Sequence, residues 1–220
     1  LTLGGVGNGT TIDHIEVVAN VDDGIEFFGG TVNASELLVW GQGDDGLDID
    51  QGYAGTISNS MVILNEASDH AMEIDGPEGS ATGSFTINNV TLIGATDECS
   101  AMGVNGEISD YRKGATGSNS NVLVMNFASG KDIELDKVAD ANSYTAGTLT
   151  FANYEIIVPQ DGGVDCYTAN LTDGSIFADK SSSSSFNADG VTIGSVVSTA
   201  TVGANPSDFN WTYAGGRDAF

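Results

Sequence analysis

The sequence has few basic residues. Its 220 residues include 31 Asp and Glu but only six Lys and Arg, and the formal net charge is −25. All of the basic residues lie at Arg112 or later. Nucleic acids and anionic membrane surfaces are bound through clustered Lys and Arg, so neither is predicted as a partner. The charge favours cations or basic partners, or an acidic surface that only keeps the protein in solution.

Proline, cysteine and long apolar runs are also scarce. Three Pro stand against 30 Gly, and no window has the apolar period of a long helix, so many short strands joined by tight turns are expected. No apolar run is long enough for membrane insertion. Cys99 and Cys166 are compatible with one disulfide or with two buried thiols. No motif for an organic cofactor occurs. Because the chain opens at Leu1 in strand-like sequence, we expect further coils upstream.

A short apolar–polar–apolar–polar stretch occurs five times, and its polar positions are mostly acids. The copies start 22 to 31 residues apart, which suits short strands joined by bends, one coil of a parallel β-helix per copy. A second pattern, Ile12-x-x-Ile15-x-Val17, precedes the first copy and recurs from Val32, Ile57 and Ile87. The acidic stretches are IEFF (25–28), LDID (47–50), MEID (72–75), MGVN (102–105) and IELD (133–136).

We therefore predict an all-β protein, a right-handed single-stranded parallel β-helix with a C-terminal cap. Coils are expected over 1–158, and the last coils and the cap, packed by Phe209, Trp211 and Tyr213, over 159–220 of one continuous domain. Alternate residues of a strand point to opposite faces, so the apolar positions of the acidic stretches should stack in the core. These are Ile25, Phe27, Leu47, Ile49, Met72, Ile74, Met102, Val104, Ile133 and Leu135.

In-register stacking would place the acids in rows on the outer surface. One row would hold Glu26, Asp48, Glu73 and Glu134, interrupted by Gly103. A second row would hold Asp50, Asp75 and Asp136, together with Phe28 and Asn105.

Coils lie about 4.8 Å apart, and unit like charges at that distance repel by about 1 kcal/mol in water and about 3.5 kcal/mol at an effective dielectric constant of about 20. A bound cation would relieve this repulsion, and Ca²⁺, which takes about six to eight oxygen ligands, is the natural candidate. The alternative is a solvated acidic face without a specific cation. The candidate ligands are Asp22, Asp23, Asp44, Asp45 and Asp69, with Asp48, Asp50, Glu73 and Asp75 as weaker ones.

Three motifs that follow one another along the chain resemble those of the polygalacturonase family, which are β-helix pectin hydrolases. Asn20-Val21-Asp22, Asp44-Asp45 and Asp69-His70 are similar to the Asn-x-Asp, Asp-Asp and Gly-His-Gly of that family. The resemblance implies a glycoside hydrolase or lyase with Asp22, Asp44 and Asp45 as catalytic carboxylates and His70 beside them. The chain departs from the family in two ways: His70 has no flanking glycines, and we expect no basic residue in the groove to bind an anionic sugar.

A longer resemblance covers most of the chain. The runs DDGIEFFGGTVN (22–33) and DDGLDIDQGY (44–53) resemble a group of secreted bacterial β-helix proteins, many of them surface lipoproteins. This resemblance implies an extracellular or cell-surface location. We therefore expect a structural, binding or adhesion module whose partners are cations, a glycan or a basic protein surface. A carbohydrate-active enzyme and a self-assembling surface or fibre subunit are the alternatives. Trp40 and Tyr53 are candidates for stacking on sugar rings.

Overall fold

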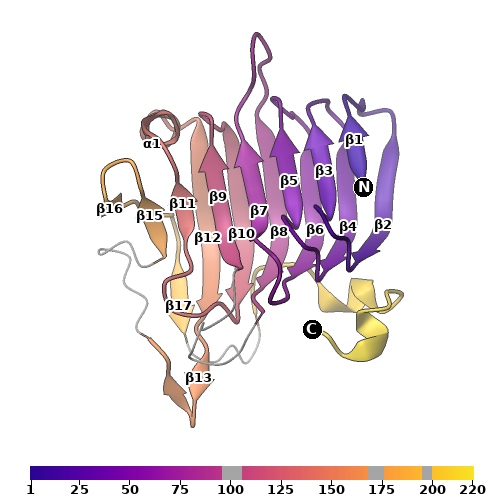
Figure 1. The fold of residues 1–220 in the computed structure, drawn as a ribbon, viewed down its shortest axis with the longest axis vertical. Coiled ribbons are helices and arrows are strands. Elements are labelled where there is room, and N and C mark those ends of the chain that lie inside the picture. Colours follow the sequence, from indigo (N-terminus) through magenta and orange to yellow (C-terminus); the bar gives the residue numbers. More distant parts are fainter. Residues whose placement is uncertain (96–105, 168–175, 195–199) are drawn as a thin grey trace.

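The computed structural model describes residues 1–95, 106–167, 176–194 and 200–220. Two large sheets contain most of its strands, and the chain alternates between them (Figure 1). The first sheet consists, in spatial order, of β1 (Thr2–Gly4), β3 (Ile25–Phe28), β5 (Leu47–Asp50), β7 (His70–Asp75), β9 (Glu107–Arg112), β11 (Ile133–Leu135), β15 (Phe177–Asp179) and β16 (Ser184–Ser185). The second sheet consists of β2 (Thr11–Val18), β4 (Asn33–Trp40), β6 (Thr56–Ile63), β8 (Phe85–Ile93), β10 (Gly117–Met125), β12 (Leu149–Ile157) and β17 (Thr192–Gly194).

Neighbouring strands in both sheets are parallel, apart from the β15–β16 pair. One strand of each sheet makes up one coil, and successive coils stack side by side (Figure 1). This is the predicted parallel β-helix. A separate hairpin is formed by β13 (Gln160–Asp161) and β14 (Val164–Asp165). The α-helix α1 (Val138–Thr145) follows β11, and no helix of the described residues has the length and apolar character needed to cross a bilayer.

The core lies between the two sheets and is built as the alternation predicts. Every predicted core residue that the structure describes is at most 1% exposed; Met102 and Val104 lie outside the described residues. Neighbouring coils stack like on like, as in Ile25 beside Leu47 and Leu47 beside Met72. Each coil thus buries its apolar face only through its neighbours.

The long strands of the second sheet each bend at one residue in the left-handed conformation. Six residues with φ between 44° and 56° stack at this corner. Two of them join a short amide ladder, in which Asn153 Nδ2 donates to Asn121 Oδ1 at 3.2 Å and Asn121 Nδ2 donates to Asn88 Oδ1 at 2.7 Å. Asparagine tolerates this conformation better than most residues. The corner also corrects the second copy of the upstream pattern, which runs Ala34-x-x-Leu37-x-Val39 rather than from Val32. The six corner residues are His14, Glu36, Asn59, Asn89, Asn121 and Asn153.

The fourth acidic strand is not the predicted one. Residues 102–105 lie outside the described residues, and β9 occupies the place between β7 and β11. Ser109 and Tyr111 therefore take the inward positions, while Asp110 and Arg112 take the outward ones. The first row of acids is uninterrupted as a result, and a cation stands in the second row where an asparagine was expected.

The C-terminal aromatics also lie elsewhere than predicted. The segment with the 3₁₀ helices η1 (Pro206–Phe209) and η2 (Gly215–Arg217) packs against the outer side of the second sheet instead of over the end of the stack (Figure 1). The physical reason is that β4 and β6 present Leu38 and Met61 outward, and Phe209 covers them. The Glu16 carboxylate of β2 accepts the amides of Tyr213 at 2.8 Å and Ala214 at 2.9 Å. In the last coils, different rings pack together: Phe151, Phe177 and Phe186.

Phe209→Ala should test this packing. The ring is fully buried, so its loss should lower the free energy of unfolding by about 3–5 kcal/mol, read as a lower denaturant midpoint. The exposed outer face should then bind a hydrophobic dye. Val164→Ala, at a position that is 70% exposed, is the control and should change neither. A Phe209 variant as stable as the parent would contradict the packing.

Candidate functional site

The outward face of the first sheet carries two adjacent rows of charged residues. In the first row, Glu26, Asp48, Glu73, Asp110 and Glu134 stand side by side from β3 to β11. The second row, two residues further along each strand, includes Asp50, Asp75 and Arg112. Parallel in-register pairing makes such rows unavoidable when each coil supplies an acid at the same position.

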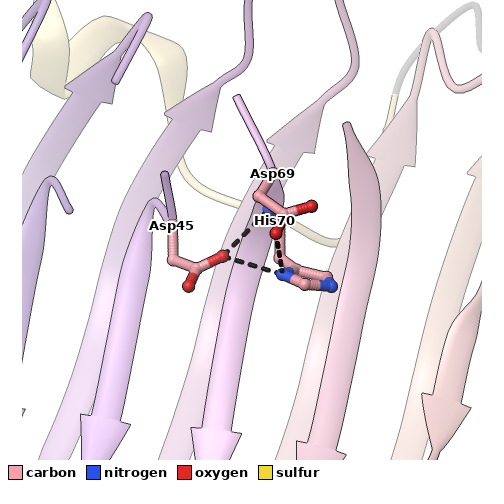
Figure 2. A group of neighbouring side chains, drawn as sticks. All are labelled: Asp45, Asp69 and His70. Atoms are coloured by element: carbon pink, nitrogen blue, oxygen red, sulfur yellow. Dashed lines mark hydrogen bonds and ion pairs between the residues drawn. The ribbon is translucent and has the colours of Figure 1, made fainter. Parts of the chain in front are cut away.

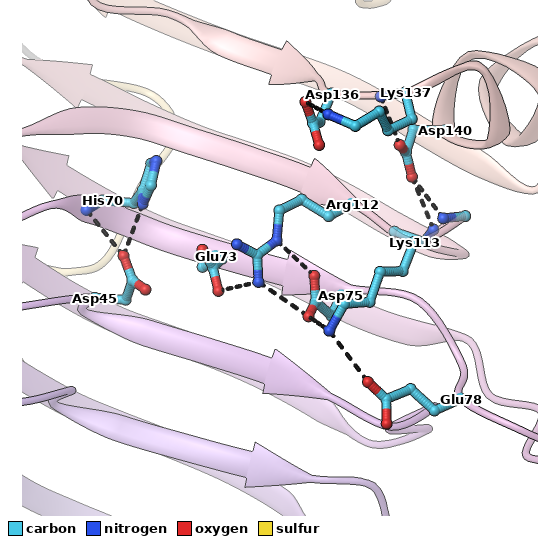
Figure 3. A network of polar contacts seen from close by, with 12 residues as sticks. Asp45, His70, Glu73, Asp75, Glu78, Arg112, Lys113, Asp136, Lys137 and Asp140 are labelled. Carbon is cyan, nitrogen blue, oxygen red and sulfur yellow. Dashed lines mark hydrogen bonds and ion pairs between the residues drawn. The ribbon is translucent and has the colours of Figure 1, made fainter.

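Basic side chains neutralise the later coils of these rows. Arg112 lies 2.5 Å from Glu73 and 2.7 Å from Asp75, and Lys113 lies 2.5 Å from Asp75 (Figure 3). Burial alone would raise the pKa of Asp75, but its hydrogen bonds to Arg112 and Lys113 hold it below the usual value. The expectation that no basic residue lies on this face to bind an anionic sugar was therefore wrong.

Lys180 neutralises the acids of the following coil in the same way. It lies 2.7 Å from Asp132 and 3.0 Å from Glu134. Two of the weaker metal-ligand candidates, Glu73 and Asp75, are already paired with Arg112. This pairing makes them poor ligands for a metal ion.

The early coils have no such neutralisation. Within the described ranges, none of the ion pairs involves Asp23, Glu26 or Asp48. One carboxylate oxygen of each lies within 4.8 Å of one from the other two. Asp48 is only 6% exposed, and its Oδ1 has no hydrogen-bond partner. Burial, followed by the charges of Asp50 and Asp23, raises the pKa of Asp48 to about 9.

The acids of the turns before these strands serve the fold first. Asp23 Oδ1 accepts the amide of Asp45 at 3.1 Å, and Asp45 Oδ1 accepts the amide of His70 at 3.0 Å. In a later coil, Glu107 Oε2 accepts the amide of Asp132 at 3.2 Å. Each carboxylate thereby satisfies a backbone donor in the next coil that the ladder leaves unpaired. Asp23 still has its second oxygen, and burial raises its pKa to about 6.

His70 forms a close pair with Asp45 (Figure 2). Its Nδ1 lies 2.8 Å from Asp45 Oδ1 and 3.7 Å from Asp69 Oδ2. Burial disfavours the imidazolium, but the hydrogen bond and charge of Asp45 raise the pKa of His70 to about 9. At neutral pH the ring is a cation that neutralises Asp45, so it is unsuited to act as a base.

The catalytic candidates Asp22 and Asp44 are exposed residues in the turns before β3 and β5, and their side chains lie close together. Carboxylate oxygens of Asp22, Asp23 and Asp44 lie within 4.8 Å of one another. This is closer than the roughly 6.5–9.5 Å between the two carboxyl groups of an inverting glycoside hydrolase. Partial burial and the neighbouring charge of Asp45 raise the pKa of Asp44.

The two proposed sugar-stacking residues are placed differently. Tyr53 is 1% exposed, and its hydroxyl donates to the Val32 carbonyl at 2.6 Å, so the prediction that it stacks on a sugar was wrong. Trp40 is half-buried beside the Tyr213 ring, with centroids 6.0 Å apart. Among the described residues, the aromatic rings most open to solvent are Trp211 and Tyr213, which the sequence pattern assigns to a cap, followed by Phe220.

Sequence reasoning also misses three members of the site. It places Glu26 in the first row but not among the metal-ligand candidates, and it assigns neither Asp110 to the first row nor Arg112 to the second. The alternation of a strand gives no signal for Asp110 and Arg112, because the apolar residues of 107–112, Ile108 and Tyr111, are three positions apart rather than two.

The pH dependence of stability should report the acids whose pKa is raised in the folded protein. Acids whose pKa is raised in the folded protein bind more protons folded than unfolded, so stability falls as pH rises. This applies to Asp48, with a pKa of about 9, and to Glu73 and Asp110, with pKa values of about 7. His70 acts in the same direction, since the stability from its raised pKa is lost as pH rises through about 9. In EDTA, the melting temperature should therefore fall steadily from pH 5 to pH 9.

Asp48→Asn provides the matched test, because it keeps the shape and removes the titration. Its melting temperature should depend less on pH than that of the parent, with the largest gain above pH 7. A parent protein that becomes more stable from pH 5 to pH 9 in EDTA would contradict the raised pKa values.

Comparison with known proteins agrees with this architecture. A family model described as a pectate-lyase-like β-helix domain matches residues 1–205. No curated protein and no solved structure matches the chain. The match extends over nearly all of the coils, from β1 through β17. The chain therefore belongs to the family of pectate-lyase-like β-helix domains.

Proposed function

We propose that this chain is a secreted or cell-surface, right-handed β-helix that binds Ca²⁺ on its acidic face and serves as a structural or binding module. The observation that carries the proposal is Asp48, a buried carboxylate with one unpaired oxygen among acids that have no protein cation in the described part of the chain. Right-handedness follows the general rule for parallel strands joined by crossover connections.

The choice of cation rests on the donor atoms. Asp23, Glu26 and Asp48 offer only carboxylate oxygens, the ligands that Ca²⁺ prefers, and Ca²⁺ accepts irregular geometry and added water. Zinc and copper sites favour nitrogen and sulfur, and His70 is already paired with Asp45. A divalent ion between the three acids would offset both the burial of Asp48 and the neighbouring charges, which together raise its pKa.

The extracellular location is supported by cysteine chemistry. Cys166 is disulfide-bonded, and Cys99 lies outside the described residues. Structural disulfides persist mainly in oxidising compartments such as the cell exterior. Together with the resemblance to secreted β-helix proteins, this bond favours a protein that works outside the cytoplasm, where Ca²⁺ is abundant.

Calcium should therefore stabilise the protein. Adding Ca²⁺ at about 100 times its Kd should raise the free energy of unfolding by about 2.7 kcal/mol, seen as a higher melting temperature than in EDTA. Asp48→Asn should abolish most of the shift. Glu134→Gln, in the same row but paired with Lys180, should retain it. The proposal fails if Ca²⁺ leaves the melting temperature of the parent unchanged.

A second candidate is a carbohydrate-active enzyme of the hydrolase or lyase type. The observation in its favour is that Asp22, Asp44, Asp45 and His70 gather on neighbouring turns, in a family whose domain is described as pectate-lyase-like. Two observations count against it. Asp45 accepts the backbone amide of His70, and the raised pKa of His70 keeps its ring positively charged at neutral pH.

Turnover on polygalacturonate and on neutral polysaccharides tests this candidate. An enzyme of this type should release reducing ends or unsaturated products, and Asp45→Asn should lower the rate at least about a hundredfold while the protein stays folded by circular dichroism. Asp161→Asn, at an exposed position in the β13–β14 hairpin, is the control. Absence of turnover by the parent on every polysaccharide leaves the binding function alone.

A further inference from the structure

A second surface with binding chemistry lies on the second sheet, away from the acidic rows. A groove of about 450 Å³ crosses the first strands of this sheet. Its floor is formed by two short rows of side chains, each lying across β2, β4 and β6. The rows are Thr11, Asn33 and Thr56, and Asp13, Ser35 and Ser58.

The groove is polar but almost uncharged. Among the described residues, Asp13 is the only ionisable one that lines it, although the whole chain has a net charge of −25. Within the described part of the chain, the hydroxyls of Thr11 and Thr56 have no hydrogen-bond partner, and both are free to donate and accept. Such a surface can exchange hydrogen bonds with a ligand rich in hydroxyls without the cost of desolvating a charge.

One exposed aromatic ring, that of Trp211, lies near this groove. Trp211 is 43% exposed and packs on His14, with ring centroids 5.4 Å apart. His14 in turn is held by Asp13 at 3.1 Å and by Glu36 at 2.7 Å. The contacts of His14 with Trp211 on one side and with Asp13 on the other thus connect the indole ring to the rim of the groove. Large aromatic rings left open to solvent in a folded protein mark interaction surfaces.

Packing and hydrogen bonds fix the backbone of the C-terminal segment on both sides of Trp211. Thr212, between Trp211 and Tyr213, is 4% exposed, and Phe209 and Ala214 are fully buried. The Glu16 carboxylate fixes the backbone at Tyr213 and Ala214. A ring held in place before binding loses little conformational entropy when a ligand stacks on it.

We propose that the groove and Trp211 together form a binding site for a neutral oligosaccharide. Sugar rings present apolar faces that stack on aromatic side chains and hydroxyls that pair with Thr, Ser and Asn. A neutral sugar is favoured over a uronate because Asp13, Glu16 and Glu36 surround the site and, among the described residues, no basic side chain lines the groove. The site shares no residue with the calcium-binding acids.

Tryptophan fluorescence offers a direct test, because Trp40 and Trp211 are the only two tryptophans. Cellohexaose, mannohexaose and xylohexaose are titrated separately in EDTA, so that binding is measured independently of calcium. At least one should change the fluorescence saturably and give matching heat by calorimetry. Trp211→Ala should weaken that binding by about tenfold or more, whereas Trp40→Phe should retain both the affinity and the fluorescence change.

Two further arms keep the test decisive. Thr56→Arg fills the groove without touching the rings and should also weaken binding, while circular dichroism confirms that the variant is folded. Trigalacturonate should not bind. The proposal is overturned if none of the three neutral sugars binds, if Trp211→Ala and Thr56→Arg bind as well as the parent, or if trigalacturonate binds as tightly as the neutral sugars.

Discussion

The structure depends on parallel, in-register stacking of coils about 4.8 Å apart. This pairing places each residue directly beside its equivalent in the next coil, so a repeated apolar position builds a continuous core and a repeated acid builds a row of carboxylates. Leu47 between Ile25 and Met72 shows the favourable side of this constraint, and Asp48 between Glu26 and Glu73 shows the unfavourable side. One hydrogen-bonding pattern therefore supplies both the stability of the fold and its electrostatic strain.

The protein relieves that strain differently along its length. Later coils place Arg112 and Lys180 among the acids, and each reaches two carboxylates. In the turns, Asp23 and Asp45 are used as acceptors for backbone amides of the next coil. Among the described residues, Asp23, Glu26 and Asp48 lie together without an ion pair, and Asp48 is buried with one unpaired oxygen. Function is best sought where the scaffold has not compensated its own charge.

The repeat in the sequence was enough to predict the architecture and most of the core, because alternation in short strands is a local property. Three features needed information that is not local. The strand β9 was misplaced because the long step between the third and fifth acidic stretches allows two registers, at residues 102–105 and at 107–112. The contact of Arg112 with Asp75 joins residues 37 positions apart and follows only from the correct register. The location of Phe209 depends on outward-facing Leu38 and Met61, whose exposure appears only once the corner in the second sheet is known.

A solenoid also restricts which charges can meet. Because its coils stack in chain order, a basic residue reaches acids only in its own coil and the adjacent ones, as Lys180 reaches Asp132 and Glu134. The absence of Lys and Arg before residue 112 thus becomes an absence of basic side chains from the first coils of the first sheet. The C-terminal segment does return to the first coil, but on the second sheet, where Arg217 lies over the Tyr213 ring. Among the described residues, no Lys or Arg is left to neutralise the acids around Asp48, so protons and cations from solution take that role. A divalent cation can bind several carboxylates at once, whereas a proton neutralises one.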